Sequence, residues 1–247
     1  MSEPVYLIFG AYGGIGSALT RLLAEKRCRL MLAGRDASKL RALADQHEAE
    51  SVLATATDHG SIEQAVQRTK EIYGRVDGVA NLFGSMLLRP AHLTKDEEWN
   101  DVLSVNLTSS FALTRAVSRA FPKEGGSVVF MSSVAARVGL PSHEAIAAAK
   151  AGLIGLALSA AATYAPKRIR FNVVAPGLTR TPLTRSITES EAALQASTRM
   201  HPLGRVGEPA EVAAAIAWFL DPQQSWVTGQ VLGVDGGLGH VRSRIGT

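Results

Sequence analysis

The stretch that decides the fold lies near the start of the chain, where the apolar run Val5–Phe9 leads directly into Gly10-Ala11-Tyr12-Gly13-Gly14-Ile15-Gly16. A helical pattern follows, with apolar residues at positions 15, 19, 22 and 23. Glycines at a strand-to-helix turn allow a tight bend and let the backbone approach a pyrophosphate, which then lies at the helix N-terminus. With a strand before it and a helix after it, this turn favours dinucleotide binding over a plain connection.

The same alternation of short apolar runs and longer helical patterns continues along the chain. Strands are expected at Val5–Phe9, Leu30–Ala33, Val52–Ala54, Gly78–Leu82, Ser127–Met131, Arg170–Ala175 and Val231–Val234. Such alternation predicts a parallel sheet with helices on both faces. We therefore expect one α/β domain over residues 1–247, built on a doubly wound, Rossmann-like sheet.

Local signals place several helix ends. Two capping boxes predict helix starts, Ser61 with Gln64 and Thr94 with Glu97. A further helix is expected from Pro209 to the Asp221-Pro222 pair, because proline suits a first helical turn and blocks continuation.

Composition narrows the function classes. A net charge of +4 without a concentrated basic stripe argues against a nucleic-acid partner. The single cysteine, Cys28, excludes an internal disulfide and fits a reducing, cytoplasmic location. The apolar stretch from Ala145 to Thr163 contains Lys150, so it predicts a buried helix and no membrane span. Histidines and the cysteine lack metal-ligand spacing, so no metal site is expected.

The second predicted strand ends at Ala33-Gly34-Arg35-Asp36. An acidic residue at this position would accept the ribose hydroxyls of NAD, whereas an arginine can pair with a 2′-phosphate. Arg35 therefore favours NADP(H) as the cofactor. The alternative is a solvated arginine that precedes a helix capped by Asp36.

Taken in order, these motifs resemble the short-chain dehydrogenase/reductase family. The matching segments are Gly10–Gly16, Asn81–Gly84, Asn106 within Val105–Leu107, Ser132-Ser133, Lys150, Asn172–Gly177 with Thr181, and Thr228–Gly237. The resemblance implies roles in catalysis for Ser133, Asn106 and Lys150. With the turn and Arg35, it implies nucleotide contacts from Gly10, Tyr12, Gly14, Ile15, Gly16, Arg35, Asn81, Gly84, Lys150, Pro176, Gly177 and Thr181.

One residue that the family pattern requires is absent. Family members carry a tyrosine thirteen residues after the serine and four before the lysine, and both counts lead to Ile146. Reduction of a carbonyl needs a proton donor for the oxygen, a role that isoleucine cannot fill. Loss of such a group typically costs about 10² to 10⁴ in rate. The resemblance therefore implies an atypical mechanism.

Other positions also depart from the family pattern. Phe9 stands where a threonine usually precedes the first motif glycine, and Leu82 and Phe83 make the segment after the fourth strand bulkier.

His143 is the first candidate to replace the tyrosine, because it lies three residues before Ile146 and shares its helix face if the helix includes residue 143. Glu144 points elsewhere on the helix and is the weaker candidate. The alternative for His143 is a surface residue at the helix start with Ser142 as the N-cap, and water could then supply the proton.

Two functions remain open. The first is an NADP(H)-dependent oxidoreductase that acts on a small-molecule carbonyl or alcohol. The second is a catalytically silent NADP(H)-binding sensor or partner subunit. Retention of Ser133, Asn106, Lys150 and Thr181 favours the first, and Ile146 favours the second.

The resemblance also implies a homo-oligomer, a dimer or a homotetramer, in which the helices near 143–164 and 97–121 pair with their copies. A lid is expected at about residues 183–203.

Overall fold

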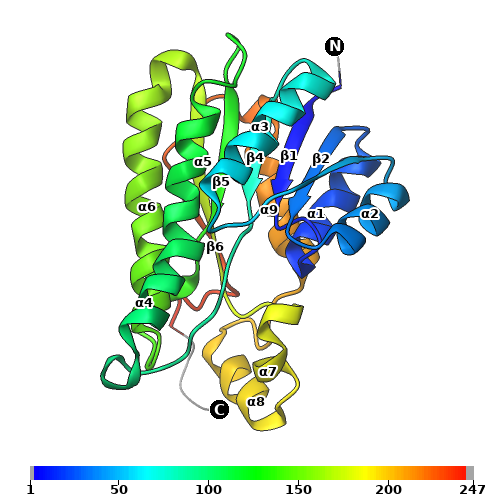
Figure 1. Ribbon diagram of the computed structural model, residues 1–247. Helices are drawn as coiled ribbons and strands as arrows, with labels where there is room; N and C mark the ends of the chain where they lie inside the picture. The colour runs from blue at the N-terminus through cyan, green and yellow to red at the C-terminus, as the bar shows by residue number, and fades with distance from the viewer. Residues whose placement is uncertain (1–2, 243–247) are drawn as a thin grey trace.

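The computed structural model describes residues 3–242 and contains a seven-stranded sheet (Figure 1). Its strands are β1 (Val5–Phe9), β2 (Arg29–Gly34), β3 (Glu50–Leu53), β4 (Gly78–Asn81), β5 (Gly126–Met131), β6 (Ile169–Pro176) and β7 (Val231–Val234). All pairings are parallel, and the order is β3-β2-β1-β4-β5-β6-β7. The predicted doubly wound α/β fold is thus confirmed, and each expected strand is present within two residues of its expected ends.

Helices cover both faces of this sheet. The helices of the described residues are α1 (Gly14–Glu25), α2 (Ala37–Gln46), α3 (His59–Tyr73), α4 (Asp96–Leu103), α5 (Ser109–Val117), α6 (Glu144–Tyr164), α7 (Arg185–Thr188), α8 (Glu191–Met200) and α9 (Pro209–Leu220), and not all of them lie on the sheet. Helices α3, α5 and α6 pack on one face, and α1, α2 and α9 pack on the other. The expected lid contains α7 and α8, which lie beyond one end of the sheet (Figure 1).

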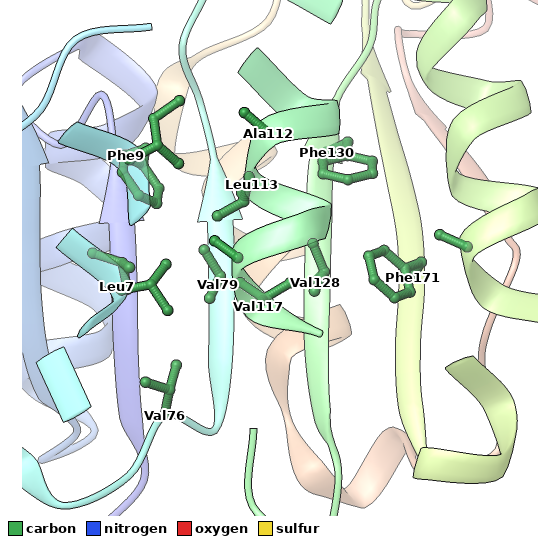
Figure 2. Packing of buried hydrophobic residues seen from close by; sticks show 14 of the residues in the cluster. Leu7, Phe9, Val76, Val79, Ala112, Leu113, Val117, Val128, Phe130 and Phe171 are labelled. Carbon is green, nitrogen blue, oxygen red and sulfur yellow. The ribbon is translucent and has the colours of Figure 1, made fainter. Parts of the chain in front are cut away.

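The two helix layers explain why the strands are apolar without alternation. In β1, Leu7 and Phe9 face the α3–α5 layer, whereas Tyr6 and Ile8 face the α1–α9 layer, and all four are buried. A strand that is covered on both faces reads as a continuous apolar run. Figure 2 shows the core between the sheet and the α3–α5 layer, where Leu7 and Phe9 lie beside side chains from α5 and from the neighbouring strands.

Both predicted helix caps were wrong, Ser61 by three residues and Thr94 by one, because the caps are Asp58 and Lys95. Helix α3 begins at His59, because the Asp58 carboxylate accepts the Ser61 amide at 3.2 Å and so acts as the cap. Helix α4 begins at Asp96, because Glu98 reaches back to the Lys95 amide at 3.0 Å. The expected hydroxyls bond elsewhere, since Ser61 Oγ accepts the Thr55 amide at 3.0 Å and Thr94 Oγ1 donates to the Pro90 carbonyl oxygen at 3.1 Å. The helix expected to begin at Pro209 is confirmed.

Helix α6 with its terminal turn, Glu144–Lys167, is long and apolar enough in principle to cross a membrane. Its inner side, however, packs against β6 and buries Leu153, Ala157 and Lys150. This packing is that of a core helix, as the sequence indicates for this stretch.

Candidate active site

A cavity of about 210 Å³ opens where β1, β4, β5 and β6 end. The chain runs outward from β1 to β3 and then returns to β4, so this cavity lies at the switch point of the sheet, where open α/β folds bind ligands. It brings together the predicted site residues Gly10, Gly14, Ile15, Gly16, Gly84, Ser133, Lys150, Pro176, Gly177 and Thr181. Residues Tyr12, Arg35, Asn81, Asn106 and His143 do not line it.

The glycine turn at the cavity floor is built for close approach. Gly10 has φ +72°, and a Cβ there would lie 2.8 Å from the Leu82 carbonyl oxygen. A Cβ at Gly16 would collide with the Gly10 carbonyl oxygen. Gly13 precedes α1, and no side chain caps that helix. The first-turn amides of α1 are therefore left for an anionic group such as a pyrophosphate.

Beyond this turn, two cations lie near the end of β2. A Cβ at Gly34 would lie 2.6 Å from Tyr12 Cε1, so Gly34 makes room for the Tyr12 ring. Arg35 follows with an exposed side chain. The Lys39 ammonium lies 5.7 Å from the centre of the Tyr12 ring. Asp36 caps α2, as the sequence indicates, by accepting the Ser38 and Lys39 amides at 3.1 Å.

Two buried asparagines shape the cavity wall from behind. Asn81 donates to Ser110 Oγ at 2.8 Å and accepts the Phe83 amide at 3.2 Å. Asn106 lies in a π-helical turn, Ser104–Thr108, and accepts the Ser85 amide at 3.2 Å while it donates to Ser85 Oγ at 2.9 Å. Both side chains therefore fix the segment after β4, which itself lines the cavity.

The segment after β5 supplies two hydroxyl groups. Ser132 donates to the backbone oxygen of Lys150 at 2.8 Å and thereby joins β5 to α6. Ser133 Oγ accepts the Ala135 amide at 3.2 Å. That bond occupies an acceptor position and leaves the Ser133 proton available for a group in the cavity.

Lys150 is buried within α6, and its Nζ donates to the Met131 carbonyl oxygen at 2.8 Å. Burial lowers the pKa of Lys150 from its ordinary 10.5 to about 8, because desolvation disfavours the charged ammonium. Its Nζ lies 3.7 Å from the point where a Cβ at Gly84 would stand. Ile146 precedes Lys150 by one helical turn, lines the same cavity and packs against Val102 and Ala149.

His143 lies outside the cavity. It is the residue before α6, with φ −110° and ψ 10°, so the helix that would have aligned it with Ile146 does not include it. Its Nδ1 lies 2.7 Å from the Pro141 carbonyl oxygen. Ser142, the expected cap, has φ +63° and does not cap the helix. The turn before α6 could not be deduced from residue spacing.

The bulky residues that depart from the family pattern pack against each other. The fully buried Phe9 ring lies 5.3 Å from the Phe83 ring, measured between their centres. The two departures therefore form one aromatic contact beneath the cavity.

Two features of the structure were not predicted, the apolar wall of the cavity and one buried histidine. The wall consists of Leu82, Phe83, Met86, Met131 and Leu183. His201 is buried, its Nδ1 lies 2.7 Å from the Ser197 carbonyl oxygen, and its Nε2 accepts the Leu178 amide at 3.2 Å. It links α8 to the segment after β6. Neither feature has a sequence signal, because both depend on how distant segments pack.

Comparison with known proteins places this site in a family. Residues 10–239 match the family model described as enoyl-(acyl carrier protein) reductase. The chain is 37% identical to the 3-oxoacyl-(acyl-carrier-protein) reductase FabG of Thermotoga maritima over 246 residues, covering 96% of this chain and 98% of that protein. It is 34% identical to the FabG of Escherichia coli, covering 95% and 96%.

Solved structures agree with these matches. A crystal structure of a variant of actinorhodin polyketide ketoreductase with NADPH superposes with a TM-score of 0.91 at 30% identity, covering 97% of this chain and 98% of that one. A short-chain type dehydrogenase/reductase from Mycobacterium ulcerans superposes with a TM-score of 0.92 at 28% identity, covering 98% and 92%. The chain therefore belongs to the short-chain dehydrogenase/reductase family of oxidoreductases.

Proposed function

We propose that the protein is an NADP(H)-dependent oxidoreductase that reduces a small, largely apolar carbonyl compound without a catalytic tyrosine. The observation that carries this proposal is the cavity, where the glycine turn, Ser133 and Lys150 converge around one volume at the switch point of the sheet. A nucleotide-binding surface without chemistry has no need for the Ser133 hydroxyl at that place.

The residues present fit a nicotinamide dinucleotide. The uncapped start of α1 and the glycines at positions 10 and 16 suit a pyrophosphate. Arg35 and Lys39 lie near the end of β2 and suit a 2′-phosphate, which supports NADP(H) over NAD(H). The relative with a bound NADPH, the actinorhodin ketoreductase, is consistent with that choice. When bound, the nicotinamide supplies or accepts a hydride.

The chain's own residues polarise and enclose the substrate. Ser133 donates a hydrogen bond to the carbonyl oxygen, on which negative charge develops during reduction. Asn106 acts indirectly, because its side chain bonds Ser85 and so holds the cavity wall in place. Leu82, Met86 and Leu183 exclude water and favour an apolar acyl or alkyl group. FabG proteins are named for 3-oxoacyl groups, and a short 3-oxoacyl thioester is therefore the first substrate class to test.

Ile146 favours a second candidate, a silent NADP(H)-binding subunit or sensor, because it leaves the cavity without a phenol. A turnover screen separates the two functions. NADPH oxidation is followed with ethyl acetoacetate, an acetoacetyl thioester, benzaldehyde and an ortho-quinone, with nucleotide binding measured by calorimetry in parallel. Turnover of any carbonyl supports the enzyme, whereas tight NADPH binding without turnover supports the silent subunit.

We further propose that the protein acts as a cytoplasmic homo-oligomer. Phe111 on α5 and Leu158 on α6 are large apolar side chains that are more than half exposed in one chain, and the two helices lie side by side (Figure 1). Such a surface suits pairing with a second copy.

A further inference from the structure

We propose that Lys150 itself is the acid that protonates the substrate oxygen, directly or through one water molecule, and so replaces the missing phenol. This inference rests on the proposed function, since it names the proton donor of that same site. It extends the family pattern, in which the lysine only assists the tyrosine.

The first observation is the composition of the cavity wall. Six of the described residues that line the cavity carry hydroxyl groups, namely Ser85, Ser132, Ser133, Thr179, Thr181 and Thr184. Lys150 is the one ionisable side chain among the described lining residues. A serine or threonine hydroxyl holds its proton too tightly to act as the acid near neutral pH. The proton must therefore come from Lys150 or from water.

The second observation is the state of the amine. An ammonium has three N–H donors, and the Met131 carbonyl oxygen takes one of them at 2.8 Å. Among the described residues no carboxylate lies within ion-pair distance of Lys150. The two remaining N–H groups of the ammonium are therefore not bonded to a carboxylate. Because Lys150 lines the cavity, an acceptor bound in the cavity can reach them.

The third observation concerns the amine's surroundings. Burial is the cause that lowers the pKa of Lys150 to about 8, and no neighbouring charge contributes. Near Lys150, α6 packs against β5 and the turn after it, which present Met131, Ser132 and Ser133 and no charged group, and against α4 and the π-helical turn Ser104–Thr108. The acidic residues of α4, which are Asp96, Glu97, Glu98 and Asp101, do not line the cavity. Glu144, on α6 itself, accepts the Ala91 amide at 3.4 Å and does not line the cavity. An amine with this pKa both holds and releases a proton near neutral pH, as an acid catalyst must.

The fourth observation is the position of the two alternatives. Ile146 offers no proton, and its apolar side chain beside Lys150 helps to keep the amine dry. His143 lies before α6, outside the cavity, with Nδ1 against the Pro141 carbonyl oxygen.

The step balances. A bound reduced nicotinamide would supply a hydride, with its electron pair, to the carbonyl carbon, and the carbonyl π pair would move to oxygen. The Lys150 ammonium gives its proton to that oxygen and becomes a neutral amine. Solvent reprotonates the amine after the alcohol leaves, and the oxidised cofactor is released.

The test is a single-turnover measurement in the reductive direction. The wild-type protein is loaded with NADPH and mixed with the panel carbonyl that it reduces fastest, between pH 6 and pH 10. We expect a constant rate at low pH and a fall of about tenfold per pH unit above the pKa of the amine. Lys150→Arg keeps the positive charge but cannot release a proton, because arginine titrates far above this range.

At saturating NADPH, with binding checked by calorimetry, Lys150→Arg should therefore lose about a hundredfold or more in rate and lose the inflection. Lys167→Arg is the matched control, because Lys167 is exposed on the turn after α6 and donates to the Ser118 carbonyl oxygen. It should keep both the rate and the inflection.

Two results would overturn the inference alone. Lys150→Arg that retains the rate and the inflection would assign the proton to water. Loss of both the rate and the inflection in His143→Ala would identify the histidine as the proton donor. A wild-type protein that binds NADPH yet reduces no carbonyl would instead defeat the proposed function, and the inference would fall with it.

Discussion

Ile146 and Lys150 lie one helical turn apart on α6, and both side chains line the same cavity. An apolar side chain thus stands beside a buried amine in a site whose other described lining residues carry no ionisable group. Burial of the Lys150 amine lowers the stability of the folded protein, by an amount that depends on pH.

The first prediction concerns that pH dependence. Burial lowers the pKa of Lys150 to about 8 in the folded protein, from 10.5, so the folded state binds this proton less tightly than the unfolded state. The resulting destabilisation is full below about pH 8, declines as the pH rises, and vanishes above 10.5. It amounts to about 3 kcal/mol at most.

Denaturant unfolding without nucleotide checks this prediction. Between pH 7 and pH 10.5, the free energy of unfolding of the wild type should rise relative to that of Lys150→Met by up to about 3 kcal/mol. The exposed Lys167→Met should show no such change. A constant difference between wild type and Lys150→Met would mean that the amine is not desolvated.

The second prediction concerns the choice of cofactor. Arg35→Ala should weaken NADPH binding by about one to two decades, or 1.5 to 3 kcal/mol, through loss of a charge-assisted contact, and should leave NADH binding unchanged. Titration calorimetry with both nucleotides measures the ratio. Arg41→Ala is the control, because Arg41 is an exposed arginine on the neighbouring helix α2. Equal affinities of the wild type for the two nucleotides would contradict the assignment.

The third prediction concerns the glycine turn. Gly16→Ala places a methyl group against the Gly10 and Ala11 carbonyl oxygens, so the turn must shift. We expect a loss of about 1 to 3 kcal/mol in stability and at least about tenfold in nucleotide affinity. Gly139→Ala introduces its methyl group into open space and should leave both nearly unchanged. Normal nucleotide affinity in Gly16→Ala would place the nucleotide elsewhere.

Much of this fold could be predicted from the sequence, because strands covered on both faces are uniformly apolar and the helices between them keep a clear period. The sequence also pointed to the glycine turn and Lys150, which the structure places in the cavity lining. It could not indicate that Asn106 and His143 lie outside that lining. Asn106 lies in a π-helical turn that has no sequence signature and bonds Ser85, and His143 lies one residue before the helix expected to hold it.

The predicted starts of α3 and α4 were wrong for a local reason. Asp58 and Glu98 accept the amides at the two helix starts, whereas the Ser61 and Thr94 hydroxyls bond backbone groups before the helices. Residue spacing alone does not show which of several polar side chains caps a helix. The apolar cavity wall was missed because Met86, Met131 and Leu183 come from three separate segments that meet only in the folded chain.

The fourth prediction concerns assembly. Phe111 is 55% exposed on α5, and Leu158 is 51% exposed on α6. We expect a dimer or a tetramer in sedimentation, and Phe111→Arg should raise the dissociation constant by about tenfold or more, because an interface would lose a buried ring. Leu93→Arg changes a similarly exposed side chain outside these helices and should leave the assembly intact. A stable wild-type monomer at micromolar concentration would contradict this prediction.

A tyrosine introduced at position 146 tests most sharply whether this cavity is built for carbonyl reduction. Ile146→Tyr places a hydroxyl group one turn before Lys150, at a cost in stability of about 1 to 3 kcal/mol from the larger ring, so its folding and NADPH binding are checked first. Ile146→Phe is the control, since it adds the ring without the hydroxyl. If the rest of the site is intact, Ile146→Tyr should reduce the panel carbonyls about 10² to 10⁴ times faster than Ile146→Phe, as NADPH oxidation will show. A folded Ile146→Tyr protein that binds NADPH and reduces none of those carbonyls would contradict carbonyl reduction at this site, and the silent nucleotide-binding function would then stand in its place.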